Sequence, residues 1–325
     1  MSVQSNTHKP LNTDEIQICN SDLEWDDFNF NSPQSSVYTT SSFLNSLNVE
    51  IEKVFFISEN KKVASAVIID TKGKPTFSIY QGITLAPLSG RTHSVFNKQL
   101  KILSSFLESL SQKYSVIDFC LNHRFSDLRA FQWLNYHTPE KGQFNISLNY
   151  TGIIPLKEET NFESFLESVR PVRRQDWRKC LKNNFKIYES DQTDTFLRLY
   201  QLTFERQDIT VNPETIQILK RISEEAIRSK TGTLTYCEDA NGVIHSATVI
   251  LQYKDTFYYE FGASDPHYRS SGASVFLMLQ GIKKAFENKA SYFDMVGINS
   301  PNRGDFKLSF NANPVPYFSV KGQFS

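Results

Sequence analysis

The stretch TGTLTYCEDANGVIHSATVILQYKDTFYYEFG at residues 231–262 decides the fold of this chain. Three runs rich in β-branched and aromatic residues, which favour strands, occur at Thr233–Glu238, Val243–Tyr253 and Thr256–Gly262. The Asn241-Gly242 pair between the first two runs is a strong hairpin signal, because its residues readily adopt the positive φ angles of a tight turn. The sequence therefore predicts an antiparallel hairpin followed by a third strand.

The stretch IEKVFFISENKKVASAVIIDTKGKPTFSIYQG at residues 51–82 repeats this pattern. Its three strand-like runs are Val54–Ser58, Val63–Asp70 and Thr76–Gly82. An internal repeat of this kind indicates two copies of one structural unit. The registers agree at Phe77/Phe257 and Gly82/Gly262, both 180 residues apart, and at Ser65-Ala66/Ser246-Ala247, 181 residues apart.

Both repeats continue with a helix and a further strand. Apolar residues recur at helical spacing over Val95–Lys113 and over Ala273–Lys289. A short apolar strand with one aspartate follows each helix, with Asp118 in the first repeat and Asp294 in the second. The shared β-β-β-α-β order favours tandem duplication, and two unrelated α/β segments with similar strands are the alternative.

A basic helical stretch, residues 161–190, links the repeats. Pro171 is expected to end or kink its first helix near Val169, because proline clashes with the preceding helical turn. Two further amphipathic helices are predicted, and a short one near 41–47 precedes the first repeat. The two amphipathic helices are expected at Asp194–Asp208 and Glu214–Arg228. The chain thus divides into two units, residues 1–150 and 151–325.

Composition limits the possible partners and surroundings. The 35 basic and 35 acidic residues give no net charge, so we expect no DNA partner, since binding to phosphates usually needs a basic excess. The four cysteines are scattered without CxxC spacing, which argues against a metal site or a disulfide framework and fits the reducing cytoplasm. A polar N-terminus and the lack of a run of about 20 apolar residues predict neither signal peptide nor transmembrane segment.

A hairpin, a third strand, a helix and a further strand resemble the core of the GNAT acyltransferase fold, so the expected fold is a mixed α/β sheet in tandem GNAT-like units. In that family a Q/R-x-x-G-x-G/A loop between third strand and helix holds the coenzyme A pyrophosphate. The second repeat has similar residues there, and the first does not. The resemblance therefore implies one acyl-CoA (acetyl-CoA) site, without metal, at Arg269, Ser270, Ser271, Gly272 and Ala273.

The C-terminal part is similar to FemAB/FemX-like tandem GNAT proteins of the polysaccharide-cluster type. The matching segments are Phe293–Gly297, Phe306–Phe310, Pro316-Tyr317 and the Tyr200–Gln207 helix. The chain departs from the pattern at Asn311, where glycine often follows, and it has no room for the helical arm that some tRNA-using members carry. The resemblance therefore implies an acyl-CoA donor rather than aminoacyl-tRNA.

Three residues are candidates for the chemistry of transfer. Glu260 stands between aromatic residues, where a raised pKa would suit a general base; otherwise it is a strand residue that faces solvent. Asp294 lies on a buried-type strand and either holds the acceptor or caps a neighbouring loop. Tyr268 could protonate the leaving thiolate, although packing is the simpler role.

Four residues are candidates for binding the acceptor. A loop is expected at 298–305, followed by Lys307, which could bind an anionic acceptor or be a surface lysine. Together with Lys307, Arg173 and Arg174 could form a positive rim around the acceptor; otherwise they lie on a solvated helix face. Tyr317 could line the acceptor pocket or simply pack in the core.

These features predict a cytoplasmic acyltransferase. We expect it to move an acyl group from acyl-CoA to an amine, or a hydroxyl, of a cell-envelope or polysaccharide precursor such as an amino sugar. The acceptor would be a small or sugar-linked anionic molecule. One alternative is an aminoacyl-tRNA-dependent peptide-bridge ligase, although the sequence does not favour a tRNA partner. The other alternative is a non-catalytic GNAT-like binding module.

Overall fold

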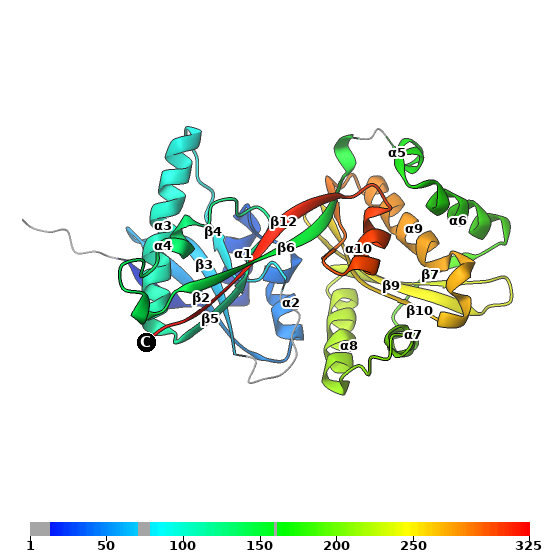
Figure 1. Cartoon of the computed structure of the whole chain (residues 1–325), viewed down its shortest axis with the longest axis horizontal. Helices are drawn as coiled ribbons and strands as arrows, with labels where there is room; N and C mark the ends of the chain where they lie inside the picture. The colour runs from blue at the N-terminus through cyan, green and yellow to red at the C-terminus, as the bar shows by residue number, and fades with distance from the viewer. Residues whose placement is uncertain (1–13, 71–78, 159–160) are drawn as a thin grey trace, which may run out of the picture.

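The computed structural model describes residues 14–70, 79–158 and 161–325. Two α/β units lie side by side, and two long strands, β6 and β12, run from one to the other (Figure 1). The described strands form a four-stranded sheet, β1-β2-β3-β4, and an eight-stranded sheet, β5-β12-β6-β11-β10-β9-β8-β7.

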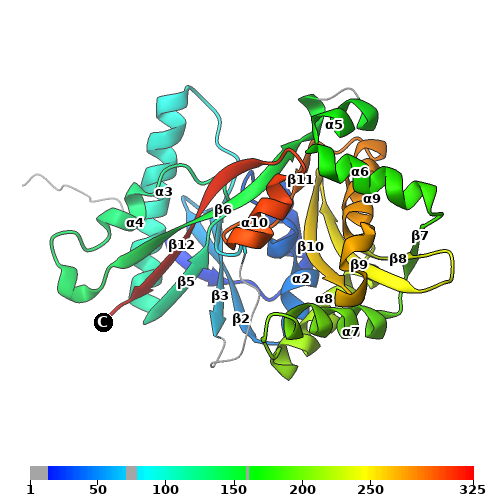
Figure 2. The ribbon, with the colours of Figure 1, turned by 45° about the vertical axis from the view of Figure 1, so that its right-hand side comes forward.

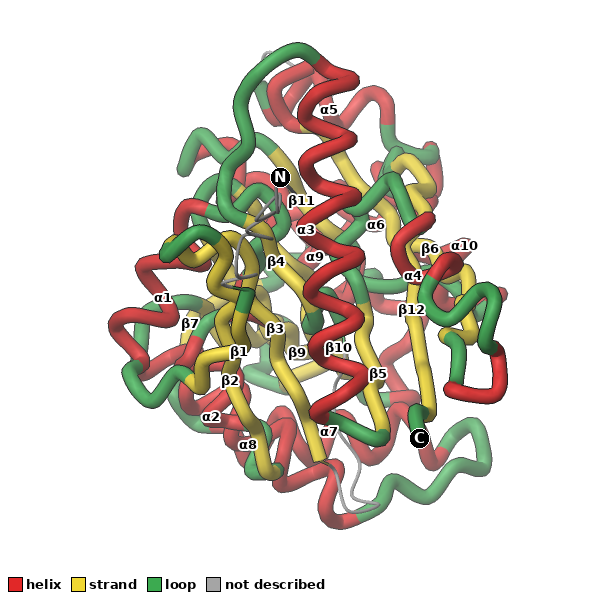
Figure 3. Tube along the Cα trace, turned by 90° about the vertical axis from the view of Figure 1, so that its left-hand side faces the viewer, coloured by secondary structure: helices red, strands yellow, loops and turns green. Residues whose placement is uncertain are grey.

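The N-terminal unit is a short sheet covered by one long helix. Leu103, Phe106 and Leu107 of α3 pack on Val54 and Ala64 of the sheet, and Figure 3 shows this helix lying across the strands. The elements are β1 (Glu15–Ile18), α1 (Asp22–Asn31), η1 (Val37–Thr39), α2 (Ser41–Ser46), β2 (Glu50–Ser58), β3 (Lys61–Asp70), β4 (Ile83–Leu85), α3 (Thr92–Lys113), β5 (Val116–Cys120), α4 (Arg129–Trp133) and η2 (Pro139–Lys141).

The C-terminal unit has helices on both faces of its strands. Helices α5 and α6 lie beside α9 (Figure 2), while α7 and α8 pack on β10 and β8 from the other side. The elements are β6 (Phe144–Pro155), η3 (Leu156–Glu158), α5 (Phe162–Ser168), α6 (Pro171–Lys182), β7 (Lys186–Ser190), α7 (Thr193–Glu205), α8 (Pro213–Arg228), β8 (Gly232–Glu238), β9 (Ile244–Tyr253), β10 (Thr256–Ser264), η4 (Pro266–Ser271), α9 (Ala273–Glu287), β11 (Tyr292–Asp294), α10 (Pro301–Leu308) and β12 (Asn313–Gln323).

The predicted repeat is present in the strand pairing. Ser65 of β3 pairs with Phe55 and Thr84, and Ser246 of β9 pairs with Cys237 and Ser264. Thr84 and Ser264 stand 180 residues apart, the spacing predicted from sequence. Residues 76–78 of the expected run Thr76–Gly82, including Phe77, lie outside the described residues; residues 79–82 are not strand, so the expected strand is wrong there, and β4 begins just after Gly82.

Strands β6 and β12 tie the units together. The N-terminal part of β6 pairs with β12, which also pairs with β5, while Ile153–Pro155 of β6 pair with β11 of the C-terminal unit. The expected boundary after residue 150 therefore falls inside β6, and the last strand returns to the N-terminal unit. A strand shared in this way holds the two units in a fixed register.

The predicted helices are present, but the sequence does not predict α1, α4 or α10, and the last part of the stretch 161–190, expected to be helical, is strand β7, which pairs with β8. Helix α5 ends at Ser168 and Pro171 opens α6, as expected from the proline. The loop expected at 298–305 is wrong in its second half, because Pro301–Leu308 form α10. Pro301 occupies the first turn of that helix, where its missing N–H has no intrahelical partner to lose.

One buried cluster runs through both units. Its aromatic members touch edge to face across the junction: the Tyr38 ring lies 5.5 Å from Tyr258, and the Tyr80 ring lies 5.3 Å from Tyr317. The junction is therefore packed like a domain core. The cluster includes Trp25, Phe43 and Phe55 from the N-terminal unit and Phe196, Leu219 and Phe261 from the C-terminal unit.

Candidate active site

Glu260 stands at a β-bulge at the junction of the units. Strand β10 pairs Tyr259 with Ile250 and Phe261 with Val249, so Glu260 is an extra residue with no partner on β9. Its half-buried carboxylate accepts a hydrogen bond of 2.5 Å from the Tyr38 hydroxyl of the other unit. Burial raises the pKa of Glu260 to about 7, although the hydrogen bond from Tyr38 and the charge of Lys307 both act to lower it. The alternative of a strand residue facing solvent is therefore wrong.

Lys307 projects from α10 toward the end of β11. Its Nζ donates to the carbonyl oxygens of Val296 at 2.6 Å and Gly297 at 3.0 Å, and it lies 5.6 Å from the centre of the Tyr259 ring. Val296 and Gly297 both have positive φ angles, 51° and 73°, at the point where β11 ends. Burial lowers the pKa of Lys307 to about 8, against the opposing effect of Asp294 and Glu260. Lys307 is not a surface lysine.

Asp294 is fully enclosed, with 0% of its surface exposed. Its Oδ1 accepts hydrogen bonds from the Thr151 hydroxyl at 2.5 Å and from the Val296 N–H at 2.8 Å, so it does cap the following loop. The buried Tyr80 hydroxyl lies close to this carboxylate. Burial raises the pKa of Asp294, while the bonds from Thr151 and Val296 and the nearby Tyr80 hydroxyl oppose the rise.

The three charged groups meet where two strands part. Strands β10 and β11 pair in parallel over Thr256–Tyr258 and Tyr292–Asp294, and then β11 ends. The Lys307 side chain lies past the end of β11, between that end and the Tyr259 ring. Each of the three groups affects the pKa of another. A half-buried carboxyl that titrates near neutrality beside an ammonium is suited to move protons.

The expected phosphate loop lies against a helix. Arg269 and Ser270 are exposed, but Gly272, with φ +92°, is buried at the start of α9. A Cβ atom at Gly272 would lie 3.2 Å from Asp176 Cβ and 3.2 Å from Cys180 Sγ of α6. The glycine therefore allows α6 to approach closely. A role of residues 269–273 in binding coenzyme A remains a prediction.

The remaining expected residues make contacts of their own. The Tyr268 ring, on η4, stacks at 4.0 Å on His245. Arg173 donates to Ser309 Oγ at 2.8 Å, with its guanidinium over the Phe306 ring, and Arg174 pairs with Glu167. Tyr317, buried on β12, touches Tyr80, so the structure joins it to the surroundings of Asp294.

Sequence reasoning missed Tyr38 and Tyr80, which the N-terminal unit contributes, and Thr151 of the strand that crosses between the units. Tyr38 carries no motif and lies 222 positions from Glu260. Thr151 stands in the crossing strand β6. Tyr80 could have been found, because the 180-residue spacing of Gly82 and Gly262 also relates Tyr80 to Glu260.

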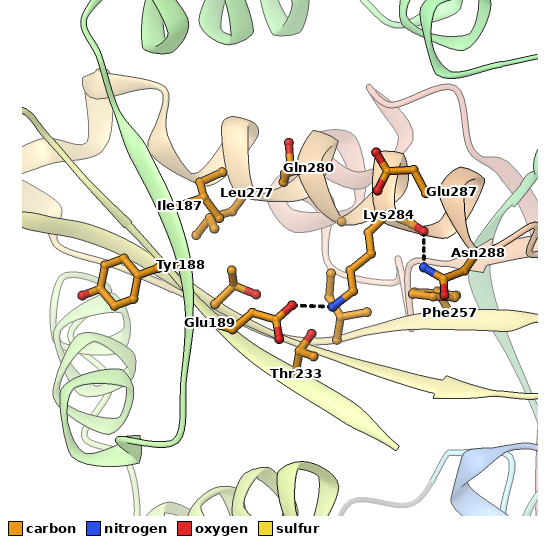
Figure 4. Close-up of a pocket in the computed structure, with 13 residues that line it drawn as sticks. Ile187, Tyr188, Glu189, Thr233, Phe257, Leu277, Gln280, Lys284, Glu287 and Asn288 are labelled. Carbon is orange, nitrogen blue, oxygen red and sulfur yellow. Dashed lines mark hydrogen bonds and ion pairs between the residues drawn. The ribbon is translucent and has the colours of Figure 1, made fainter. Parts of the chain in front are cut away.

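A pocket of about 360 Å³ lies elsewhere, between α9 and strands β7 to β9 (Figure 4). Lys284 of α9 reaches toward Glu189 of β7 there, with 2.5 Å between Nζ and Oε1. Phe257 lines this pocket and packs with α9, whereas its neighbour Tyr258 faces Tyr38, because successive strand side chains point to opposite faces. The pocket is thus on the opposite face of the sheet from Glu260.

Two further findings concern the described part of the chain. None of its helices is both long and apolar enough to cross a membrane. No group of three or more histidine, cysteine or acidic side chains in residues 14–70, 79–158 and 161–325 is placed to hold a metal ion.

Comparisons with known proteins agree with this architecture. Residues 168–308 match the sequence profile of a family described as an acetyltransferase (GNAT) domain. No curated protein matches the chain. Three solved structures are similar over nearly all of it: FemX (TM-score 0.69, 12% identity, 94% of this chain and 96% of that chain); a tandem GNAT protein from the clavulanic acid biosynthesis pathway (0.57, 10%, 96% and 98%); and the C-terminal domain of a putative lysylphosphatidylglycerol synthetase from Agrobacterium fabrum (0.53, 10%, 93% and 92%).

At these identities the structural matches establish the fold. The sequence match lies in the unit that holds Glu260, Asp294 and Lys307. The chain therefore has the tandem GNAT fold, and the match to an acetyltransferase (GNAT) domain lies within its C-terminal unit.

Proposed function

We propose that the protein is an acyltransferase that joins an acyl group to an amine, or a hydroxyl, of its acceptor at the junction of the two units. The observation that carries this proposal is Glu260, a half-buried carboxylate with a pKa near 7 beside the Lys307 ammonium. A group that titrates close to neutral pH can accept a proton and release it again within one cycle. This property also argues against a non-catalytic binding module.

Glu260 removes the proton from the acceptor nitrogen as that atom attacks the acyl carbonyl; the C–S bond of the thioester then breaks, and the coenzyme A sulfur leaves and takes up the proton that Glu260 releases. Lys307 has three N–H groups, and two of them are fixed by the carbonyls of Val296 and Gly297. The third is available, among the described residues, to stabilise the negative charge that develops on the carbonyl oxygen. Asp294 holds the Val296 N–H and thereby shapes the turn on which Lys307 rests.

The preferred donor is an acyl-CoA such as acetyl-CoA. Arg269 and Ser270 are exposed at the start of α9, where a helix N-terminus favours an anion. Lys179 of α6, also exposed, donates to the Ser270 carbonyl at 2.7 Å and adds a positive charge beside the loop. These exposed groups would contact the phosphates, while Gly272 serves the packing of α6.

A second donor class follows from the position of α6. That helix closes over Gly272, the residue expected to let a pyrophosphate approach the backbone. It also exposes Arg178 and Lys182 next to the loop. An aminoacyl ester of tRNA needs no pyrophosphate site and would use such a basic face, so a peptide-bridge ligase is the second candidate.

The acceptor we propose is a sugar-linked, anionic precursor of the cell envelope or of a polysaccharide, such as an amino sugar, met in the cytoplasm. Its class comes from the resemblance to FemAB/FemX-like proteins. Support within the structure is the half-buried pair Lys307 and Arg173, both at α10: Lys307 belongs to this helix, and Arg173 lies against its Phe306.

The test combines donor binding with transfer. Coenzyme A at a large excess over its Kd should raise the melting temperature, because a ligand that binds only the folded state stabilises it. Glu260→Gln should retain this shift but lose transfer of the acetyl group from acetyl-CoA to amino sugars, measured by mass spectrometry, by at least about a hundredfold.

Glu214→Gln, at the exposed start of α8, is the matched control and should keep full activity. Full activity of Glu260→Gln would refute the role of this residue. A thermal shift with aminoacyl-tRNA but none with coenzyme A would favour the second donor class.

A further inference from the structure

Tyr38 is held rigidly by the N-terminal unit. It lies in the short helix η1, where the Ser36 N–H donates to Thr39 Oγ1 at 3.1 Å and the Trp25 ring N–H donates to the Thr39 carbonyl at 2.7 Å. Its ring touches Phe43 at 5.0 Å, and none of its surface is exposed. The orientation of the Tyr38 hydroxyl is therefore fixed by its own unit.

This segment also contacts the C-terminal unit at a second point. Lys254, at the turn between β9 and β10, donates to the Ser32 carbonyl at 3.3 Å and to Ser35 Oγ at 2.8 Å. Together with the Tyr38–Glu260 bond, these contacts attach residues 32–38 to two points of the C-terminal unit. One is the turn before β10, and the other is Glu260 within β10. Movement of either unit would change the position of the hydroxyl relative to Glu260.

Glu260 has few other polar neighbours. The titratable and charged groups that face it are Asp294 on β11, Lys307 on α10, Tyr200 on α7 and Tyr38. Of these, Tyr38 is the one that donates a hydrogen bond, and it takes Oε2. No described residue donates to Oε1, so that oxygen is left for a proton from the acceptor.

We propose that Tyr38 is a positioning residue for the transfer reaction, through which the N-terminal unit fixes the Glu260 carboxylate with Oε1 toward the acceptor. This inference rests on the proposed role of Glu260 as base. The proposal explains what the N-terminal unit adds to the active site, although that unit lacks the expected phosphate loop. The hydroxyl of Tyr38 remains protonated and donates, because burial and the Glu260 charge keep its pKa well above its usual value.

The proposal is tested by titrating Glu260 directly, without substrate. Protein carrying 13C-labelled glutamate side chains is titrated by NMR, and Glu260→Gln identifies the signal. Tyr38→Phe keeps the ring but removes the donor, and a lost bond to a charged group should raise the midpoint by about one pH unit. The acid limb of the pH dependence of kcat/KM should move upward by the same amount.

Tyr236→Phe is the matched control. It also removes a buried hydroxyl, one that bonds to the Phe196 N–H and the Gln192 carbonyl on the far side of the same cluster. It should lower the melting temperature and leave the Glu260 midpoint unchanged. If Tyr38→Phe does not fold, 3,5-difluorotyrosine at position 38 replaces it; as a stronger donor, it should lower the midpoint.

An unchanged Glu260 midpoint in Tyr38→Phe would overturn the proposal, as would an equal shift in Tyr236→Phe. Failure of the proposed function looks different. In that case Glu260→Gln keeps full transfer activity, while the midpoint still shifts in Tyr38→Phe.

Discussion

The close contact between α6 and the start of α9 makes a quantitative prediction for Gly272→Ala. Gly272 has φ +92°, a region that costs an L-residue about 1–2 kcal/mol. The new Cβ would also meet Asp176 Cβ and Cys180 Sγ at 3.2 Å and the Asp176 carbonyl at 3.3 Å. Overpacking of this kind costs about 1–3 kcal/mol, so we expect a total loss of about 2–5 kcal/mol of unfolding free energy.

Gly242→Ala separates the two effects. Gly242 also has a positive φ, +79°, but nothing lies within 4 Å of the Cβ that alanine would add. It should therefore lose only the backbone part, about 1–2 kcal/mol. Urea unfolding followed by circular dichroism measures both losses through the shift of the midpoint at constant slope.

A third variant identifies the neighbour responsible. Cys180→Ala removes the sulfur that faces Gly272, so the cost of Gly272→Ala should fall in that background by about 1 kcal/mol or more, a coupling that a double-mutant cycle detects. Equal losses for Gly272→Ala and Gly242→Ala, with no coupling to Cys180, would refute the conclusion that this glycine serves the packing of α6.

Three further predictions concern the charged site. Lys307→Met should lower kcat/KM for the acceptor about ten- to a hundredfold, since a bond from a charged donor contributes about 1.5–3 kcal/mol, while steady-state kinetics of Lys101→Met, at an exposed position of α3, should match wild type. Asp294→Asn should move the acid limb of the pH–rate profile to lower pH, because the Asp294 charge helps to raise the pKa of Glu260; an upward shift would contradict this. Because burial raises the pKa of Glu260 from its ordinary value of 4.5 to about 7 in the folded state, wild-type stability should fall as the pH rises from about 4.5 to 7, by up to about 3 kcal/mol. Urea unfolding of Glu260→Gln should show this fall reduced, and an identical slope in both proteins would be inconsistent with it.

The sequence predicted the fold because the fold is encoded locally. Alternating apolar residues, the Asn241-Gly242 turn and Pro171 each act within a few positions, and the repeated register shows that the same pattern was used twice. The helix at Pro301–Leu308 was missed because a stretch rich in asparagine, proline and glycine resembles a loop. Proline is common both in loops and in the first turn of a helix, so it did not distinguish between these two structures.

The site was only partly predictable, because it depends on contacts between distant segments. The sequence singles out Glu260, Asp294 and Lys307 separately, and the structure brings them together, but a β-bulge is a property of strand pairing and cannot be inferred from one strand. Tyr38 belongs to the other unit and has no motif. Gly272 shows the opposite difficulty: it fits a phosphate-loop motif, yet the structure gives it a packing role under α6.

The pH dependence of acyl transfer tests the central claim most directly. The quantity is kcat/KM for an amine acceptor with acetyl-CoA as donor, followed by release of the coenzyme A thiol and corrected for the unprotonated fraction of the amine. If Glu260 is the base, the profile falls below a pKa of about 7 with the slope of one proton, and Glu260→Gln abolishes this limb along with most of the rate. A corrected profile that stays flat through neutral pH in wild type, or an acid limb that survives in Glu260→Gln, would contradict the account.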